Sequence, residues 1–213
     1  MEELFKNCKD KNILLEKIKE QPNLKIKYKS YFSVTMLAFK YCKNKDVLLE
    51  ILKENPDLNM QDNNGYTIAM YAFEYCKDKE VLLEILKQKP DLNIQDNNGF
   101  TAVIYAFKYC KDKEVLLEIL KQKPDLNIQN NNGTTVTMYA FGYCKNKDVL
   151  LEILKQKPDL TLKNYHNETV LDIALESYVK SPNFEFNVLE KLYDENSKQD
   201  KKLFNKEYIK LRN

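Results

Sequence analysis

Thiols are the most reactive side chains that recur along this sequence, and they recur with one fixed step. The five cysteines stand 34 residues apart, at Cys8, Cys42, Cys76, Cys110 and Cys144. A disulfide needs Cα atoms within about 7 Å, whereas neighbouring packed helices lie about 8–10 Å apart. One cysteine in each step also provides no paired-cysteine zinc motif. The spacing therefore favours buried, reduced cysteines that pack as small apolar residues over reactive thiols.

Tyrosines and one histidine are the other side chains that could do chemistry. Two tyrosine series share the step: Tyr71, Tyr105 and Tyr139, and Tyr41, Tyr75, Tyr109 and Tyr143. They could stack on nucleic-acid bases, but their helical spacing inside apolar segments favours core packing. His166, the only histidine, has no matched acid or nucleophile and is expected on the surface. No phosphate-binding loop, dinucleotide motif or metalloprotease motif occurs. We therefore predict no catalytic residue, no metal site, no cofactor and no enzyme activity.

A 34-residue repeat positions all of these side chains. Prolines and alanines keep the same step, at Pro22, Pro56, Pro90, Pro124 and Pro158, and at Ala38, Ala72, Ala106, Ala140 and Ala174. A fixed period of this length is typical of a solenoid, in which each unit buries its apolar face only by stacking on its neighbours. Chains of this kind usually present a surface and do no chemistry.

Each unit is predicted to hold two helices and a polar loop. In the unit 66–99, Thr67 can cap a first helix over 68–75, which is apolar almost throughout. Asp78 can cap a second helix over 80–89, whose apolar residues form one stripe. The nine residues that follow Pro90 are not helical in pattern. Leu92 and Ile94 alternate with polar residues, as in a short extended segment, and the loop ends in a tight turn with glycine.

The loop carries a family resemblance. Residues 90–101 read P-D-L-N-I-Q-D-N-N-G-F-T, which resembles the ankyrin-repeat segment G-A-D-V-N-A-x-D-x-x-G-x-T-P-L-H. Residues 168–174, E-T-V-L-D-I-A, are similar to the T-P-L-H-x-A part. The middle repeats lack that signature, and the turn between the helices differs. The tetratricopeptide repeat has the same length but no such loop. The resemblance covers about residues 30–196, and it implies a concave binding face lined by first helices and hairpin tips.

The predicted fold class is all-α: an ankyrin-like helix-turn-helix-hairpin solenoid with an N-terminal half-repeat cap and a C-terminal helical cap. We expect one solenoid over 1–213. Its parts are an N-terminal partial repeat (1–29), four repeats (30–65, 66–99, 100–133 and 134–167), a last repeat (168–196) and a C-terminal helix (197–213). The last repeat carries an insertion of about five residues around Pro182. A partner-binding role for the C-terminal helix is the less favoured alternative.

Composition limits the classes of partner. The net charge of +2 argues against strong, sequence-independent attraction to nucleic acid or to an anionic membrane. No stretch approaches the roughly 18 apolar residues of a membrane span, and the N-terminus resembles no signal peptide. We expect a cytoplasmic monomer. Export by a route that needs no N-terminal signal is the alternative.

Comparison of the repeats with one another indicates where a partner could bind. The units 66–99 and 100–133 differ at six positions, all in the first helix or the hairpin tip. Neutral drift after duplication would give the same pattern. The candidate partner-binding residues are Phe32, Lys40, Asn63, Asn64, Tyr66, Glu74, Asn97, Asn98, Phe100, Lys108, Asn131, Asn132 and Thr134. Of these, Phe32, Tyr66, Phe100 and Thr134, at the corner between hairpin and helix, are predicted to be exposed.

The favoured function is a protein-interaction scaffold or adaptor that binds an unidentified protein through its concave face and hairpin tips. An inhibitor or effector-type protein is a specific version of it. The alternative is a nucleic-acid-binding module that uses the basic N-terminal loop, residues 25–29, and exposed aromatic side chains. The near-neutral net charge counts against this alternative.

Overall fold

The computed structural model describes residues 13, 16, 34–180 and 186–199. The predicted N-terminal cap, Phe32 and most of the predicted C-terminal helix lie outside the described residues. The chain divides into two compact units, Met1–Gln122 and Lys123–Asn213, and each is described by itself.

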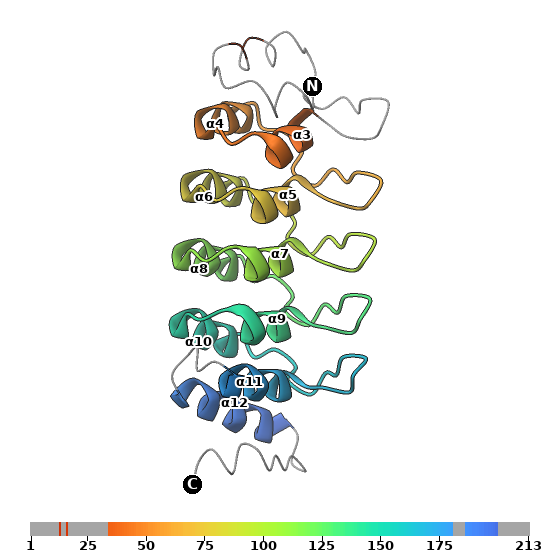
Figure 1. The fold of residues 1–213 in the computed structure, drawn as a ribbon, viewed down its shortest axis with the longest axis vertical. Coiled ribbons are helices and arrows are strands. Elements are labelled where there is room, and N and C mark those ends of the chain that lie inside the picture. The colour runs from red at the N-terminus through yellow and green to blue at the C-terminus, as the bar shows by residue number, and fades with distance from the viewer. Residues whose placement is uncertain (1–12, 14–15, 17–33, 181–185, 200–213) are drawn as a thin grey trace. The chain divides into compact units, whose positions relative to one another are not determined.

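Unit 1 is built from pairs of short helices. The described helices are α3 (Val34–Tyr41), α4 (Lys45–Lys53), α5 (Ile68–Tyr75), α6 (Lys79–Lys87), α7 (Ala102–Tyr109) and α8 (Lys113–Lys121). The first helices α3, α5 and α7 pack side by side, and the second helices α4, α6 and α8 form a parallel row. The loops that follow α4 and α6 project on the same side (Figure 1).

Unit 2 continues the helix pairs with one change. Its described helices are α9 (Val136–Tyr143), α10 (Lys147–Lys155), α11 (Val170–Lys180) and α12 (Phe186–Gln199). The first helix α11 packs on α9, and α12 packs on α10 and α11. Helix α12 begins five residues later than the 34-residue period requires, as the insertion predicts.

The local sequence explains where the helices begin and end. Thr67 Oγ1 accepts a hydrogen bond from the Met70 amide at 3.3 Å, and Asp78 Oδ1 accepts one from the Glu80 amide at 3.0 Å. Both predicted caps are therefore confirmed. Helix α6 ends at Lys87, before the predicted position, because Lys89 takes the left-handed φ of 51° that closes the helix ahead of Pro90.

The loop is less extended than predicted. The alternation of apolar and polar residues after Pro90 favoured a short extended segment, but Leu92 and Asn93 form a turn. Only isolated bridges, between Gln95 and Thr101 and between Gln129 and Thr135, join the two sides of the hairpins. Among the described residues no longer strand forms, so the all-α prediction is confirmed.

Phenylalanines and cysteines repeat through the core. One phenylalanine in each of α3, α5, α7 and α9 is at most 1% exposed: Phe39, Phe73, Phe107 and Phe141. The cysteines that end these helices are buried and form no disulfide: Cys42, Cys76, Cys110 and Cys144. The prediction of buried, reduced cysteines is confirmed for these residues, and Cys8 lies outside the described part of the chain.

The buried thiols should resist alkylation in the folded protein. Burial raises the pKa of the Cys76 and Cys110 thiols above the ordinary value, so little reactive thiolate is present. We expect iodoacetamide to modify them far more slowly in buffer than in concentrated guanidinium chloride. Peptide mass spectrometry would give the rate for each cysteine. Equal rates in the two solvents would contradict the burial.

Two glycines of unit 2 make a matched pair for stability measurements. Gly142 lies inside α9, and an added Cβ would meet Ile173 Cγ2 at 3.5 Å, an ordinary contact. Gly142→Ala should therefore stabilise the protein by about 0.5–1 kcal/mol, the cost of glycine inside a helix. Gly133→Ala should destabilise it by about 1–2 kcal/mol, because Gly133 has φ +74° and its Cβ would lie 3.0 Å from Asn164 Cα. Urea unfolding of both variants checks the opposite signs.

Candidate partner-binding face

A groove in unit 1 lies where the loop tips meet the first helices. It has a volume of ≈ 380 Å³ and is lined by Lys40, Asn64, Tyr66, Tyr71, Tyr75, Asn97 and Asn98. The structure thus brings five of the candidate residues together, from α3 and two successive loops. Sequence reasoning missed Tyr71 and Tyr75 as lining residues, because their place in an apolar helix indicated the core.

Buried aspartates shape the loop tips. Asp62 Oδ1 accepts hydrogen bonds from the Asn64 and Tyr66 amides, both at 2.8 Å. Asp96 Oδ1 does the same for the amides of Asn98 and Phe100, also at 2.8 Å. The aspartates are 7% and 5% exposed, so these bonds are shielded from water. These hydrogen bonds therefore fix the backbone conformation of each loop tip.

Neighbouring loops are also bonded to each other. The Asn97 amide donates to Asn64 O at 2.9 Å, and Asn97 Nδ2 donates to Asn63 O at 2.9 Å. Gln61 Nε2 donates to Gly65 O in its own loop at 2.8 Å and to Gln95 O in the next at 2.9 Å. These bonds hold the two neighbouring tips in one register.

Three aromatic rings line the groove, those of Tyr66, Tyr71 and Tyr75, and we call them its aromatic floor. The Tyr66 ring centroid lies 5.0 Å from that of Tyr71 and 5.3 Å from that of Tyr105, and Phe100 lies 5.8 Å from Tyr105. Tyr66 and Phe100 are therefore half-buried, and the prediction that they are exposed is wrong. The residue after the hairpin glycine folds back onto first-helix tyrosines, including one from the next repeat.

Tyrosine hydroxyls tie the first helices to the loops. Tyr71 OH donates to Asp62 Oδ2 at 2.8 Å, and Tyr105 OH donates to Asp96 Oδ2 at 2.8 Å while also contacting Tyr66 OH. Burial and these bonds raise the pKa of Tyr71 and Tyr105 far above the ordinary value. The hydroxyls therefore stay protonated and act as donors, which makes these tyrosines structural supports of the groove.

The corresponding bond is reversed in unit 2. There Asn130 replaces the aspartate, and its Nδ2 donates to Tyr139 OH at 3.3 Å. Its Oδ1 still accepts from the Asn132 and Thr134 amides, at 2.9 and 3.0 Å. The sequence change at this position thus keeps the turn and reverses the direction of the hydrogen bond to the tyrosine.

Three charged side chains occupy equivalent positions on successive first helices. Lys40 lies on α3, Glu74 on α5 and Lys108 on α7, and all three are half-buried. The Lys40 and Lys108 ammonium groups lie 5.5 Å from the Tyr71 ring centroid and 5.7 Å from that of Phe100. Charges of alternating sign therefore run along the face.

Glu74 is the exceptional member of this series. Burial raises the pKa of its carboxyl group, although its bond to Tyr75 and the two lysine charges act in the opposite direction. Its Oε2 is buried and has no hydrogen-bond partner within the described structure. A buried acceptor without a donor is costly, so this oxygen is suited to a donor brought by a partner.

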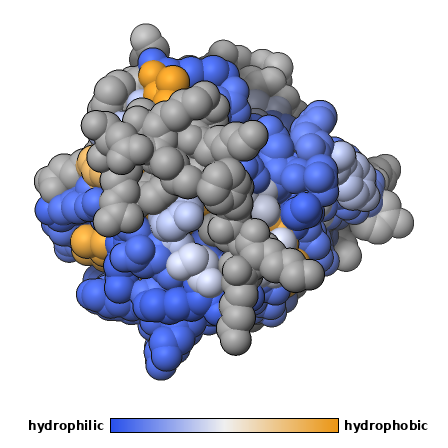
Figure 2. Space-filling model, turned by 90° about the horizontal axis from the view of Figure 1, so that it is seen from below, coloured by the Kyte–Doolittle hydropathy of each residue, from blue (hydrophilic) through white to orange (hydrophobic). Residues whose placement is uncertain are grey.

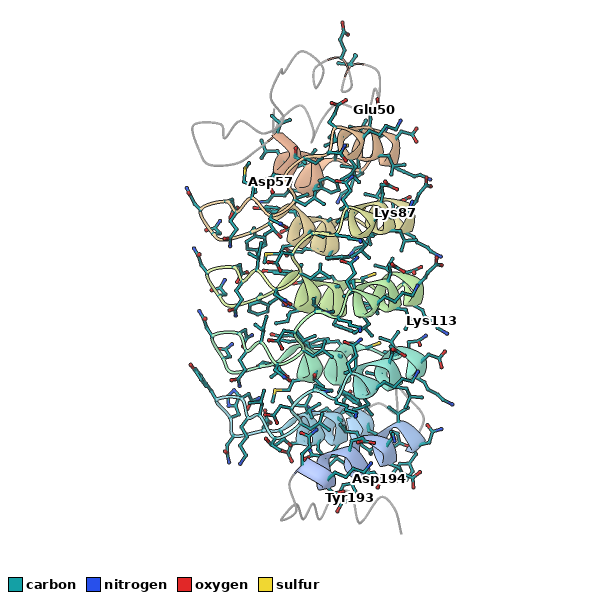
Figure 3. All side chains as sticks on the ribbon, turned by 180° about the vertical axis from the view of Figure 1, so that it is seen from behind. Glu50, Asp57, Lys87, Lys113, Tyr193 and Asp194 are labelled. Atoms are coloured by element: carbon teal, nitrogen blue, oxygen red, sulfur yellow. The ribbon has the colours of Figure 1, made fainter. Side chains whose placement is uncertain are left out.

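The second helices carry charges that pair with one another. The ion pairs within α4, α6 and α8 join Lys53 to Glu50, Lys87 to Glu84 and Lys121 to Glu118 at 2.7–2.8 Å. Lys45 pairs with Glu80, and Lys79 with Glu114, between neighbouring helices. Figure 3 shows Lys87 and Lys113 on this side of unit 1, away from the loops.

The remaining candidates lie elsewhere. Asn131, Asn132 and Thr134 belong to unit 2, where Asn132 O accepts a hydrogen bond from the Tyr165 amide at 2.9 Å.

Tyr165 was missed by the sequence analysis and is 79% exposed at the tip of its loop. The other tips carry asparagine at this position, so the change to tyrosine was the available signal. His166 is exposed, as predicted.

One tyrosine assigned to the core lies on the surface. Tyr143 is 48% exposed, although its ring stacks on Tyr139 at 5.8 Å. The equivalent position in α11 is Ser177, whose side chain is too small to cover the ring. The prediction of core packing is therefore wrong for Tyr143.

The described surface has few other features that point to chemistry. Among the described residues no group of three or more His, Cys, Asp or Glu side chains could hold a metal ion. In the same residues no helix is both long and apolar enough to cross a bilayer. In the face that Figure 2 shows, the described residues are mostly hydrophilic, and the hydrophobic ones form small separate spots.

Comparison with known proteins identifies the class of protein. Residues 35–122 match the family model of ankyrin repeats in three copies. These residues are therefore ankyrin repeats, and the predicted fold class, an all-α ankyrin-like solenoid, is confirmed. A search of curated protein sequences returns no match.

Solved structures include similar chains. One belongs to the complex of the predatory endopeptidase Bd0816 from Bdellovibrio bacteriovorus with the immunity protein Bd3460. The alignment has a TM-score of 0.64 and 22% sequence identity, and it covers 91% of this chain and 94% of the other. At this identity the likeness shows the fold.

Proposed function

We propose that this protein is a non-catalytic interaction scaffold that binds another protein through the groove face of unit 1. We define the groove face as the lining residues of the groove together with Glu74, Phe100 and Lys108. The observation that carries the proposal is the composition of the groove. Its aromatic floor lies beside a rim of asparagines, Asn64, Asn97 and Asn98, on loops that hydrogen bonds hold in place. Tyrosines anchored in a hollow are typical interface residues, and a pre-formed site loses little conformational entropy on binding.

The contrast with the second helices supports this choice of face. Lysines and glutamates on the second helices pair with one another, and the two most similar units do not differ there. On the groove face, Glu74 keeps an oxygen without a partner, and its equivalents in the two neighbouring repeats, Lys40 and Lys108, are lysines. The charges on the second helices already have partners within the protein, whereas Glu74 on the groove face would gain a hydrogen bond from a bound partner.

We further infer that the protein acts by covering its partner, as an inhibitor or immunity-type protein does. The support is the shared fold with a chain from an endopeptidase–immunity protein complex. No group on the groove face is arranged as a nucleophile with its base, so occupancy is the mode of action that these residues can provide.

Nucleic acid fits the groove face less well. A phosphate backbone presents one negative charge after another, and Glu74 lies between the two lysines that would receive it. The basic loop at 25–29 lies outside the described residues. Tyr66 and Phe100 pack on other rings and leave less surface for base stacking.

Affinity capture tests the proposed function. Wild-type protein and a Tyr66→Ala/Phe100→Ala variant would capture proteins from a lysate of the source organism. Loss of anchors of this kind typically costs 2 kcal/mol or more each, so the partner should be reduced at least roughly 30-fold. A Lys87→Ala/Lys121→Ala variant, on the second helices, should capture as much as wild type. Circular dichroism would verify folding, and equal capture by all three proteins would refute the assignment.

A further inference from the structure

The three charges of the groove face have a regular spacing. Lys40, Glu74 and Lys108 occupy the seventh position of α3, α5 and α7, and these helices pack side by side. Packed helices lie about 8–10 Å apart. The face therefore presents positive, negative and positive charge at steps of about 8–10 Å.

One backbone conformation presents side chains at the same step. A polyproline-II helix has 3 residues per turn and a rise of about 3.1 Å, so residues i, i+3 and i+6 share one face at about 9 Å intervals. An α-helix places the same residues only about 4.5 Å apart, and a β-strand alternates its side chains between two faces. The spacing therefore fits a polyproline-II segment that carries a charge at every third residue.

The ring floor suits the same conformation. Polyproline-II segments dock into grooves lined by aromatic side chains, and here Tyr66, Tyr71 and Tyr75 line the groove in contact with one another. The unpaired backbone of such a segment needs donors and acceptors. Asparagine amides at the rim, Asn64 and Asn98, carry both.

We propose that the groove face binds an extended, polyproline-II segment of a partner protein with an acidic residue, a basic residue three positions later and a second acidic residue three positions after that. The acidic residues meet Lys40 and Lys108, and the basic residue meets Glu74. This inference rests on the proposed function and adds the chemistry of the segment that is recognised.

Glu74 is the central determinant. Its buried Oε2 has no donor in the described structure, so an ammonium or guanidinium group from the partner would supply the missing bond. An ion pair formed in this half-buried place is less screened by salt than a surface pair. A basic residue at the middle position should therefore contribute more to affinity than either acidic residue.

Selection from a phage library of random peptides tests the charge pattern. The targets are the wild-type chain and a charge-inverted variant, Lys40→Glu/Glu74→Lys/Lys108→Glu. Wild type should enrich acidic, basic and acidic residues at i, i+3 and i+6, and the inverted variant should enrich the opposite signs. Enrichment without a charge pattern at these positions, or the same pattern on both targets, would overturn the proposal.

A single isosteric change guards against misfolding of the triple variant. A fluorescein-labelled peptide with the order Asp-Pro-Ala-Lys-Pro-Ala-Asp would be titrated by fluorescence polarisation. Glu74→Gln should weaken its binding about tenfold, and Lys87→Met, on the second helices, should not change it. Binding no tighter than that of a scrambled peptide, or equal binding to Glu74→Gln, would refute the inference.

The two proposals fail in different ways. If the Tyr66→Ala/Phe100→Ala variant loses the captured partner while the peptides show no charge pattern, the scaffold function stands and the peptide chemistry falls. If the variant retains the partner, the proposed function itself falls.

Discussion

The Phe73→Ala variant should lose about 3–5 kcal/mol of unfolding free energy. Phe73 is fully buried at 0% exposure on α5, which packs against α3, α6 and α7. Truncation removes apolar contacts with the helices on both sides and leaves a cavity, because the surrounding structure relaxes only partially. This loss is a large part of the 5–15 kcal/mol that is ordinary for a folded domain.

Urea denaturation followed by circular dichroism measures this effect. The control is Lys87→Ala on α6, whose side chain is exposed and which should change stability by less than about 0.5 kcal/mol. A loss below about 1 kcal/mol for Phe73→Ala would show that the core around α5 is packed less tightly than the burial indicates.

Asp96→Ala should have the next largest effect, a loss of about 2–4 kcal/mol. The carboxylate accepts from the amides of Asn98 and Phe100 and from Tyr105 OH. Alanine would leave these donors without an acceptor, and each unsatisfied buried group costs about 1–3 kcal/mol. The loop tip would also lose its shape, so peptide binding at the groove should weaken.

The chain contains its own control for this prediction. Asp96→Asn reproduces the arrangement at Asn130, where the amide oxygen keeps the turn and Nδ2 donates to Tyr139 OH. We expect Asp96→Asn to cost less than about 1 kcal/mol in the same urea experiment. If asparagine and alanine were equally damaging, the carboxylate charge rather than the hydrogen-bond geometry would support the loop.

Local signals explain why much of the fold could be predicted from the sequence. The caps at Thr67 and Asp78 bond to residues two or three positions away, so the residue types alone identify them. The early end of α6 could not be read in this way. Lysine rarely takes positive φ, yet Lys89 does so with φ 51°.

The groove depends on contacts between repeats, which a sequence pattern does not display. Tyr66 was predicted to be exposed because the side chain that covers it, Tyr105, comes 39 residues later in the chain. Tyr71 was assigned to the core. The residue is only 3% exposed, and yet it lines the groove. Variation between repeats correctly drew attention to Glu74, whereas its unsatisfied oxygen is visible only in three dimensions.

Hydrogen bonds between neighbouring repeats join residues that are about one 34-residue period apart in the chain. Gln61 reaches 34 residues ahead to Gln95 O, Gln88 reaches 36 back to Leu52 O, and the Asp91 amide reaches 32 back to Asn59 Oδ1. Partners this close along the chain meet quickly, so folding should start in any repeat and spread to its neighbours. Duplication or loss of a whole unit leaves each donor with an equivalent acceptor. The gene can therefore change length in steps of one repeat while the protein continues to fold.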